Sequence, residues 1–190
     1  MPPVTPSPYR AGIVGTGFMG TVHSRAVRAS GGEVAGVVGS TPERGAEAAT
    51  ALGTKAYDDV EALLADPAVT VVHVCTPNHL HTPLARAALA VGKHVVCEKP
   101  LATTLADAAA LEAAAVEAGV VATVPFVYRF HPMVREARAR IAAGALGRVT
   151  LAHGGYFQDW LARPSDDSWR VDPDRGGATR AFGDVGSHWC

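Results

Sequence analysis

The stretch Gly15-Thr16-Gly17-Phe18-Met19-Gly20 decides the fold of this chain. It follows the short apolar run Ala11–Val14, which is typical of a buried strand, and it opens onto residues 21–29, which read as a helix. A strand, a glycine-rich turn and a helix are the context that the dinucleotide fingerprint G-x-G-x-x-G requires. Gly15 allows a tight turn, Gly17 lets the backbone approach a pyrophosphate, and Gly20 lets the helix pack closely on the strand. The N–H groups at the start of the helix would then face the phosphates.

Strands and helices alternate along residues 10–126. Apolar, β-branched runs predict strands at residues 11–14, 33–39, 55–57, 69–75, 93–97 and 120–126. Helices are predicted between these runs. Thr41 and Asp58 are the predicted N-caps of two of these helices, and Gly53, Gly92 and Gly119 are predicted to end three of them. This alternation predicts βαβ units and a parallel, doubly wound sheet, which is an α/β fold.

The character of the sequence changes after Phe126. A helix is predicted over Met133–Ala143, and Arg148–Phe157 alternates well enough for a strand of a second sheet. A long polar stretch with tryptophans follows. We therefore predict a disordered, proline-rich leader at residues 1–9, a nucleotide-binding domain at 10–126, and the beginning of a second domain at 127–190.

Composition excludes several classes of protein. The 190 residues are 48% hydrophobic with a formal net charge of −1, so a sizeable core is expected and no basic surface points to a nucleic acid. No apolar run approaches the ~18 residues that cross a membrane, and the leader lacks the features of a signal peptide. The cysteines are too few for a disulfide framework and fit a reducing compartment, so the expected location is the cytoplasm: Cys75, Cys97 and Cys190.

The cofactor prediction depends on the end of the second predicted strand. An NAD-binding fold places an acidic residue there, roughly 20 residues after the glycines, to hold the ribose 2′-hydroxyl. This sequence has Gly39-Ser40 instead, and Glu43 lies in the following helix. Ser40, Thr41 and Arg44 could surround a 2′-phosphate, although Arg44 could also be an ordinary solvated helix residue. We predict NADP or NAD as the cofactor, with NADP preferred.

Two turns follow consecutive strands and converge on the same crevice, because ligands of open α/β sheets lie at the carboxyl ends of the strands. The first turn is Thr76-Pro77-Asn78 and the second is Glu98-Lys99-Pro100. Asn78 could bind a ribose or amide group, or it could only cap the next helix. His79 and His81 lie two positions apart and do not share a helix face, so no metal site is predicted.

These motifs, together with the segment Asp184-Val185-Gly186-Ser187-His188, resemble the Gfo/Idh/MocA oxidoreductase family from Arg10 to Cys190. The resemblance implies a Rossmann domain followed by an α+β domain with a large, mostly antiparallel sheet that often packs in a homo-oligomer interface. Members are roughly twice as long as this chain. We therefore expect the second domain to be incomplete here and the substrate pocket to be affected.

The resemblance also implies roles for individual residues. Lys99 matches the lysine beside the nicotinamide and the substrate hydroxyl, and Asp184 and His188 match the acid/base histidine and its carboxylate partner. A histidine suits removal of a hydroxyl proton, and a lysine can stabilise the alkoxide or relay the proton. If Asp184 and His188 share a helical turn, their spacing places them on one face. The domain junction adds Tyr128, Arg129 and His131 as candidates for contact with the cofactor or substrate.

The complete set of predicted cofactor residues is Gly15, Thr16, Gly17, Phe18, Met19, Gly20, Ser40, Thr41, Arg44, Thr76, Pro77, Asn78, His81, Glu98 and Lys99. The predicted activity is hydride transfer between NAD(P) and a CH–OH group of a sugar, sugar derivative or cyclitol. Two alternatives stay open. A branch of the family hydrolyses glycosidic bonds with tightly held NAD, and the chain could also bind nucleotide without catalysis.

Overall fold

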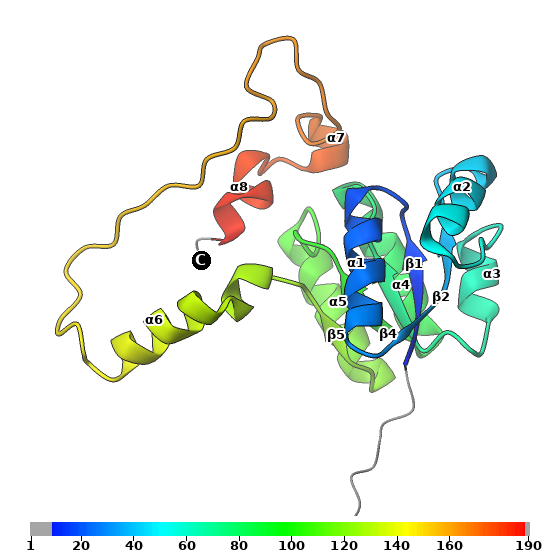
Figure 1. Cartoon of the computed structure of the whole chain (residues 1–190), viewed down its shortest axis with the longest axis horizontal. Coiled ribbons are helices and arrows are strands. Elements are labelled where there is room, and N and C mark those ends of the chain that lie inside the picture. The colour runs from blue at the N-terminus through cyan, green and yellow to red at the C-terminus, as the bar shows by residue number, and fades with distance from the viewer. Residues whose placement is uncertain (1–8, 189–190) are drawn as a thin grey trace, which may run out of the picture.

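The computed structural model describes residues 9–188, so the predicted leader lies, apart from Tyr9, outside the described residues. Five parallel strands form one sheet in the order β2-β1-β3-β4-β5 (Figure 1). The strands are β1 (Arg10–Val14), β2 (Glu33–Val38), β3 (Val71–Val74), β4 (His94–Cys97) and β5 (Ala122–Thr123). The chain leaves β2 at one edge and returns to β3 on the far side of β1. This order confirms the predicted doubly wound sheet.

Helices cover both faces of the sheet. On one face, α1 (Phe18–Ala29) and α2 (Pro42–Leu52) pack against Ile13, Val37 and Val71. On the other face, α3, α4 and α5 pack against Val72, Val74 and Val95; their bounds are Val60–Ala65, His81–Ala90 and Leu105–Ala118. Strands that are apolar on both faces need helices on both sides, which explains their nearly continuous runs of valine. No helix of the described part of the chain is long and apolar enough to cross a membrane.

The ends of these helices follow the predicted capping chemistry, with one correction. The Thr41 hydroxyl accepts a hydrogen bond from the Arg44 backbone N–H and begins α2, as predicted. The cap of α3 is Asp59, whose carboxylate accepts from the Ala62 N–H at 2.7 Å, and not the predicted Asp58. Gly53 and Gly119 end α2 and α5 with φ of +60° and +65°, which is the left-handed conformation that glycine adopts without strain.

Two of the predicted strands are reduced to very short pairings. The run at 55–57 makes only an isolated bridge between Ala56 and Val37. The run at 120–126 contributes only Ala122–Thr123, which pair with β4 at the edge of the sheet.

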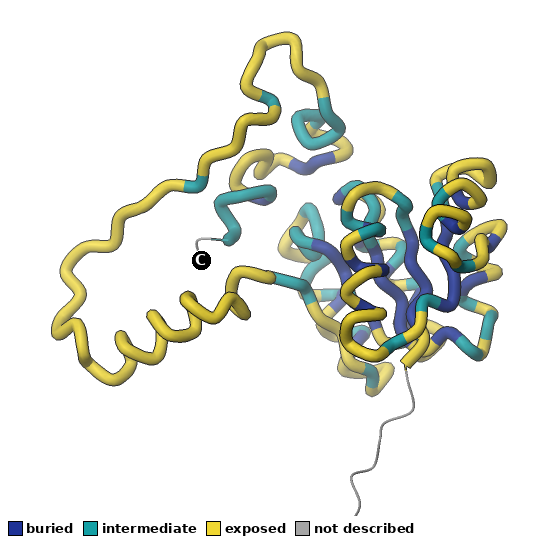
Figure 2. Tube along the Cα trace, in the orientation of Figure 1, coloured by how far each residue is buried: buried dark blue, intermediate teal, exposed yellow. Residues whose placement is uncertain are grey.

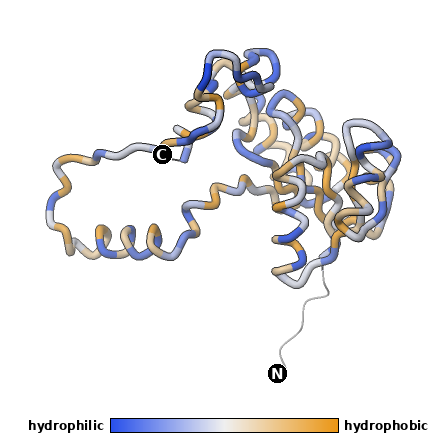
Figure 3. The backbone as a smooth tube through the Cα atoms, turned by 45° about the horizontal axis from the view of Figure 1, so that its top comes forward, coloured by the Kyte–Doolittle hydropathy of each residue, from blue (hydrophilic) through white to orange (hydrophobic). Residues whose placement is uncertain are grey.

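Residues 127–188 contain helices and irregular segments. The helices are α6 (Pro132–Ala142), α7 (Pro173–Gly176) and α8 (Ala181–Asp184), and the 3₁₀ turns are η2 (Val127–Phe130) and η3 (Gly186–His188). The strand predicted at 148–157 is wrong, because those residues run as an exposed, irregular segment (Figure 2). Hydrophobic and hydrophilic residues mix along this arc (Figure 3). A strand needs a neighbour for its N–H and C=O groups, and none of the described residues supplies one.

Candidate active site

The glycine turn between β1 and α1 has the geometry of a phosphate cradle. Gly15 has φ of +101°, and a Cβ there would lie 2.6 Å from the Cys75 carbonyl oxygen. A Cβ at Gly20 would overlap the Gly15 carbonyl oxygen, so both positions require glycine. A Cβ at Gly17 would meet nothing within 4 Å. The space over Gly17 is therefore open at the point where a pyrophosphate would approach the backbone.

The start of α1 is prepared for an anion. Gly17 is the N-cap and supplies no side-chain hydrogen bond, and the first turn of α1 contains no acidic residue. The N–H groups of that turn and the positive end of the helix dipole consequently face outward without a carboxylate to neutralise them. The chemistry of this cradle fits the phosphates of a dinucleotide. Thr16, Phe18 and Met19 lie in the same turn, and the Phe18 side chain is exposed.

The segment after β2 is polar, exposed and free of carboxylates at the strand end. The Arg44 guanidinium donates to the Ser40 hydroxyl at 3.4 Å, and the side chains of Ser40, Thr41 and Arg44 are all accessible. Glu43 lies in the first turn of α2, where a backbone hydrogen bond and the Thr41 hydroxyl lower its pKa. The predicted trio thus gathers at one place, next to the start of a helix.

The turns after β3 and β4 are tied together by His81. Its Nδ1 lies 2.7 Å from the Pro100 carbonyl oxygen and its Nε2 lies 2.9 Å from the Thr76 carbonyl oxygen. The side chain is 1% exposed, so it holds the two turns in place and is covered from a ligand. Burial lowers the pKa of His81 despite these two carbonyl partners. Beside it, the Thr76 hydroxyl is buried and has no hydrogen-bond partner among the described residues.

The Asn78 side chain does not cap the helix that follows, so the capping role considered for it is wrong, whereas its contact with a cofactor stays a prediction. Its amide donates to the Gly176 carbonyl oxygen at 2.8 Å, in α7, and no side-chain cap hydrogen bond starts the helix that follows. His79 lies 3.3 Å from the neighbouring Arg175 carbonyl oxygen. These contacts fasten the C-terminal segment onto the carboxyl end of the sheet, where α7 is drawn in Figure 1. Pro77 directs the chain into this contact.

Lys99 and Asp184 meet across 85 positions of the sequence. The Lys99 Nζ donates to the Asp184 carboxylate at 2.8 Å and to its backbone oxygen at 2.7 Å. The same carboxylate lies 3.6 Å from Nε of Arg170, whose guanidinium lies over the ring of Trp169. Asp184 is therefore the centre of two ion pairs at the place where the C-terminal segment meets the sheet.

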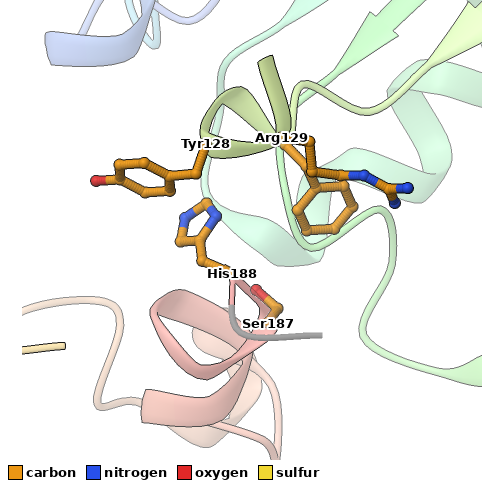
Figure 4. Close-up of a pocket in the computed structure, with 5 residues that line it drawn as sticks. Tyr128, Arg129, Ser187 and His188 are labelled. Carbon is orange, nitrogen blue, oxygen red and sulfur yellow. The ribbon is translucent and has the colours of Figure 1, made fainter. Parts of the chain in front are cut away.

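Aromatic side chains surround His188 at the domain junction. The Tyr128 ring packs edge-on against it with centroids 4.7 Å apart, and Figure 4 shows Tyr128 directly beside the imidazole. The Tyr156 ring stacks at 6.1 Å, and its hydroxyl lies 2.7 Å from that of Tyr128. Burial, followed by the positive charge of Lys99, lowers the pKa of His188 below its usual 6.5. At neutral pH the imidazole is therefore uncharged and able to accept a proton.

The predicted pairing of Asp184 with His188 differs from the structure. Helix α8 ends at Asp184, Val185 leaves the helical conformation, and His188 follows in η3. The two side chains therefore do not sit one turn apart on a continuous helix, and the Asp184 carboxylate binds Lys99. Nδ1 of His188 is buried without a hydrogen-bond partner among the described residues.

The other two junction residues have different surroundings. Arg129 lines a small pocket together with Tyr128 and His188. Its guanidinium points away from the imidazole of His188 (Figure 4). His131 is the N-cap of α6, where its Nδ1 accepts from the Met133 N–H at 3.2 Å. Of the three predicted junction residues, Tyr128 is the one that contacts His188.

Sequence reasoning missed several side chains of this region. Tyr156 was expected in a strand and Arg170 lies in a polar stretch without periodicity, so no local signal places either side chain beside Lys99 or His188. A sequence signal was available for His23, because its spacing places it on the same side of the helix as Gly20, Ser24 and Val27, which is the buried side of α1. Its Nε2 lies 3.1 Å from Oε1 of Glu98, which is itself buried. Among the described residues, no group of three His, Cys, Asp or Glu is placed to hold a metal ion.

A doubly wound sheet with a phosphate cradle at its carboxyl edge and a lysine–carboxylate–histidine group beside it defines a dinucleotide-binding oxidoreductase fold. The chain belongs to the Gfo/Idh/MocA family: residues 9–126 match the oxidoreductase family with an NAD-binding Rossmann fold. Residues 134–190 match the C-terminal domain of that family. The resemblance inferred from the motifs is confirmed.

Individual relatives are sugar dehydrogenases and reductases. Levoglucosan dehydrogenase of Pseudarthrobacter phenanthrenivorans is 39% identical in an alignment of 188 positions that covers 93% of this chain and 48% of that protein. The 1,5-anhydro-D-fructose reductase of Ensifer adhaerens is 43% identical and covers 80% of this chain and 46% of that protein. D-xylose 1-dehydrogenase (NADP(+)) 2 of Haloferax volcanii is 38% identical and covers 88% of this chain and 51% of that protein.

A solved structure of a levoglucosan dehydrogenase in complex with NADH and levoglucosan superposes with a TM-score of 0.89 at 38% identity. The match covers 96% of this chain and 52% of that one. The chain thus spans about half the length of the relatives that it matches.

Proposed function

We propose that this chain carries the cofactor site and the proton-transfer group of an NAD(P)-dependent oxidoreductase that acts on a CH–OH group of a sugar, sugar derivative or cyclitol. One observation carries the proposal: Asp184 binds Lys99 in the turn after β4, and His188 packs against Phe126 just after β5, so both side chains lie at the carboxyl edge of the sheet that presents the glycine cradle. The named activities of the relatives support this substrate class. Because the chain spans about half of those relatives, the activity of the whole protein is part of the proposal.

Bound NAD(P) supplies the acceptor or donor of the hydride. The open space at Gly17 and the first turn of α1 would hold the pyrophosphate. His188 accepts the hydroxyl proton of the substrate, which its lowered pKa permits at neutral pH. The Lys99 ammonium stabilises the alkoxide that forms as the proton leaves. In this scheme Asp184 fixes the position of Lys99 and does not touch His188.

The experiment is a pair of titrations followed by a turnover assay. Binding of NADH and NADPH to the purified chain is measured by the fluorescence of the dihydronicotinamide. Turnover is then measured with levoglucosan, D-xylose and inositol as donors. The proposal expects binding, and reduced cofactor released in proportion to oxidised sugar. Absence of binding for both cofactors contradicts it. Release of a free sugar from a glycoside without net NAD(P)H supports the hydrolase alternative, and binding without any turnover supports the non-catalytic one.

We further propose that NADP is the preferred cofactor. The end of β2 presents Ser40 and Thr41 without a carboxylate, and Arg44 is close enough to Ser40 to reach a 2′-phosphate together with it. The xylose dehydrogenase relative is named as an NADP enzyme, whereas the levoglucosan dehydrogenase structure holds NADH, so the relatives allow either cofactor.

A single substitution tests this preference. Ser40→Asp places a carboxylate where it would accept from a ribose 2′-hydroxyl and repel a 2′-phosphate, so the ratio of NADPH to NADH affinity should fall about tenfold or more. Thr50→Asp, on the exposed part of α2, adds the same negative charge away from the end of β2 and should leave the ratio unchanged. A ratio that stays constant in Ser40→Asp contradicts NADP preference without affecting the proposed activity.

A further inference from the structure

A chain of three buried polar side chains links α1, β3 and β4 beneath the active-site turn. Nδ1 of His23 lies 2.9 Å from Nδ1 of His73, and Nε2 of His23 lies 3.1 Å from Oε1 of Glu98. The three residues are 6%, 8% and 6% exposed, in the order His23, His73 and Glu98. The other carboxylate oxygen of Glu98 accepts from the backbone N–H of Lys99 at 3.0 Å. The chain therefore ends on the backbone of the residue whose ammonium is proposed to stabilise the alkoxide.

The strand geometry explains why these side chains meet. Side chains alternate between the two faces of a strand, so His73 on β3 points to the same face as Val71, which packs on the α1 side. Val96 on β4 also belongs to that side, and Glu98, two residues later, continues on it. His23 descends from α1 onto the same face. The strand β3 lies between β1 and β4. The contact therefore connects α1, which begins at the glycine cradle, with the turn after β4, which carries Lys99.

The proton arrangement makes His23 the donor to Glu98. An ionised Glu98 can only accept, so Nε2 of His23 carries a proton. Burial lowers the pKa of His73 to about 3, so that ring is uncharged. Its Nδ1 then either donates to or accepts from Nδ1 of His23, and both choices leave the bond from His23 to Glu98 intact. A buried carboxylate with one such donor is held more firmly than a solvated one.

An apolar core would stabilise this face at least as well as buried polar groups, so stability alone does not explain the arrangement. We propose that His23 is a positioning residue, which holds the Glu98 carboxylate so that it fixes the backbone of Lys99 and thereby the placement of the Lys99 ammonium against Asp184. The role of Lys99 in stabilising the alkoxide rests on the proposed function, but the position of its ammonium can be measured without any substrate or cofactor.

The measurement uses the scarcity of lysine in this chain, whose lysines are Lys55, Lys93 and Lys99. Brief reductive methylation with formaldehyde and cyanoborohydride, read by peptide mass spectrometry, gives a labelling rate for each amine. Lys99 is partly covered and bound to Asp184, so its rate should be low. Lys55 is accessible and Lys93 is bound to two backbone carbonyls at the opposite end of the sheet, so they serve as internal references.

Two amide substitutions separate positioning from packing. In His23→Gln the amide reaches the place of Nε2 and can still donate to Glu98, whereas in His23→Asn it reaches only the place of Nδ1, next to His73. The proposal expects His23→Asn to raise the labelling rate of Lys99 severalfold with Lys55 and Lys93 unchanged, and His23→Gln to restore the wild-type rate. Val27→Ala, a cavity on the same buried side of α1, should lower Tm without raising the Lys99 rate.

The proposal is overturned if Lys99 labels at the wild-type rate in a folded His23→Asn variant, or if His23→Gln and His23→Asn raise it equally. It is also overturned if Val27→Ala raises the rate as much, since the effect would then follow stability. Should His23→Asn not fold, Glu98→Gln decides the question. That variant removes the charge of the carboxylate at nearly constant volume, and an unchanged Lys99 rate in it contradicts the proposal. Failure of the sugar assay affects none of these outcomes.

Discussion

In residues 9–126 the strands β1 and β3 bury side chains on both faces of the sheet, whereas no residue of 127–167 is buried. Both regions contain helices of similar length: α2 and α6 each have 11 residues. Helix α2 buries Gly45 and Ala49 against the sheet, and α6 buries nothing. The difference lies in what each helix packs against and not in its own sequence pattern.

The comparison shows that the two halves of the proposed activity depend on different interactions. The phosphate cradle rests on a packed core and on steric requirements at Gly15 and Gly20. The proton-transfer group rests on a few polar contacts between α7, α8 and the turns after β3 and β4. We therefore expect substitutions in the first region to change cofactor binding or overall stability, and those at the junction to change turnover or local docking. Four predictions test this separation, in order of decreasing effect.

Replacement of Lys99 by alanine should have the largest effect. The ammonium is the only group of the proposed scheme that opposes the alkoxide charge, and removal of one such group costs about 100- to 1,000-fold in turnover. Binding of NAD(P)H should change little, because the cradle at Gly15–Gly20 does not include Lys99. Steady-state kinetics and fluorescence titration measure the two quantities. Lys55→Ala, at an exposed surface lysine, is the control, and turnover equal in both variants contradicts the assignment of Lys99.

The second prediction concerns acid stability of the sheet region. In the folded chain the pKa of His73 is about 3 against a usual value of 6.5, because burial disfavours the charged ring. The unfolded chain therefore takes up a proton that the folded chain refuses. The stabilising contribution is complete above pH 6.5 and is lost as pH falls from there towards about 3. Near pH 5 the loss amounts to about 2 kcal/mol.

Urea unfolding at about pH 7.5 and about pH 5 measures this loss. His73→Leu removes the titrating group, so the free energy of unfolding should depend less on pH in that variant than in the wild type. His153→Leu, at an exposed histidine of the C-terminal region, is the control and should keep the wild-type dependence. An equal pH dependence in the wild type and His73→Leu would show that other groups are responsible.

The same division describes what could be inferred from sequence. The glycine turn, the order of strands and helices and the cap at Thr41 were predictable, because each is fixed by residues within one or two turns of the chain. The contact of Asn78 with Gly176 spans 98 positions and depends on how the C-terminal segment docks, so no local pattern predicts it. The strand predicted at 148–157 fails for a related reason: alternation describes a possible strand, but a partner is needed to form it.

The third prediction tests the cradle by itself. Gly17 has an extended backbone and open space at its Cβ position, so Gly17→Val should fold normally while its side chain occupies the place of the pyrophosphate. We expect NAD(P)H affinity to fall about tenfold or more with little change in Tm. Gly31→Ala is the complementary control, because φ of +82° strains any side chain there without placing it near the cradle. It should lower Tm and leave affinity unchanged, and the opposite pattern would refute the cradle.

The last and most local effect is expected at the junction, where Asn78 binds the Gly176 carbonyl oxygen. Asn78→Ala leaves this buried carbonyl without its donor, which costs about 1–3 kcal/mol of docking free energy. The cost should fall on the C-terminal region alone, since Asn78 contributes no packing between the strands. Tryptophan fluorescence isolates that region, because all the tryptophans lie there: Trp160, Trp169 and Trp189. Circular dichroism of the helices reports mainly on residues 9–126.

Urea unfolding followed by both signals therefore distinguishes local undocking from global unfolding. In Asn78→Ala the fluorescence midpoint should move to lower urea, whereas the midpoint from circular dichroism should stay within error of the wild type. Thr50→Ala, which removes an exposed hydroxyl bonded only within α2, should move neither midpoint by a comparable amount. If both midpoints of Asn78→Ala shift together, the C-terminal segment unfolds as one cooperative unit with the sheet. Substitutions at the junction would then act on cofactor binding as well, and the separation of the two regions would be lost.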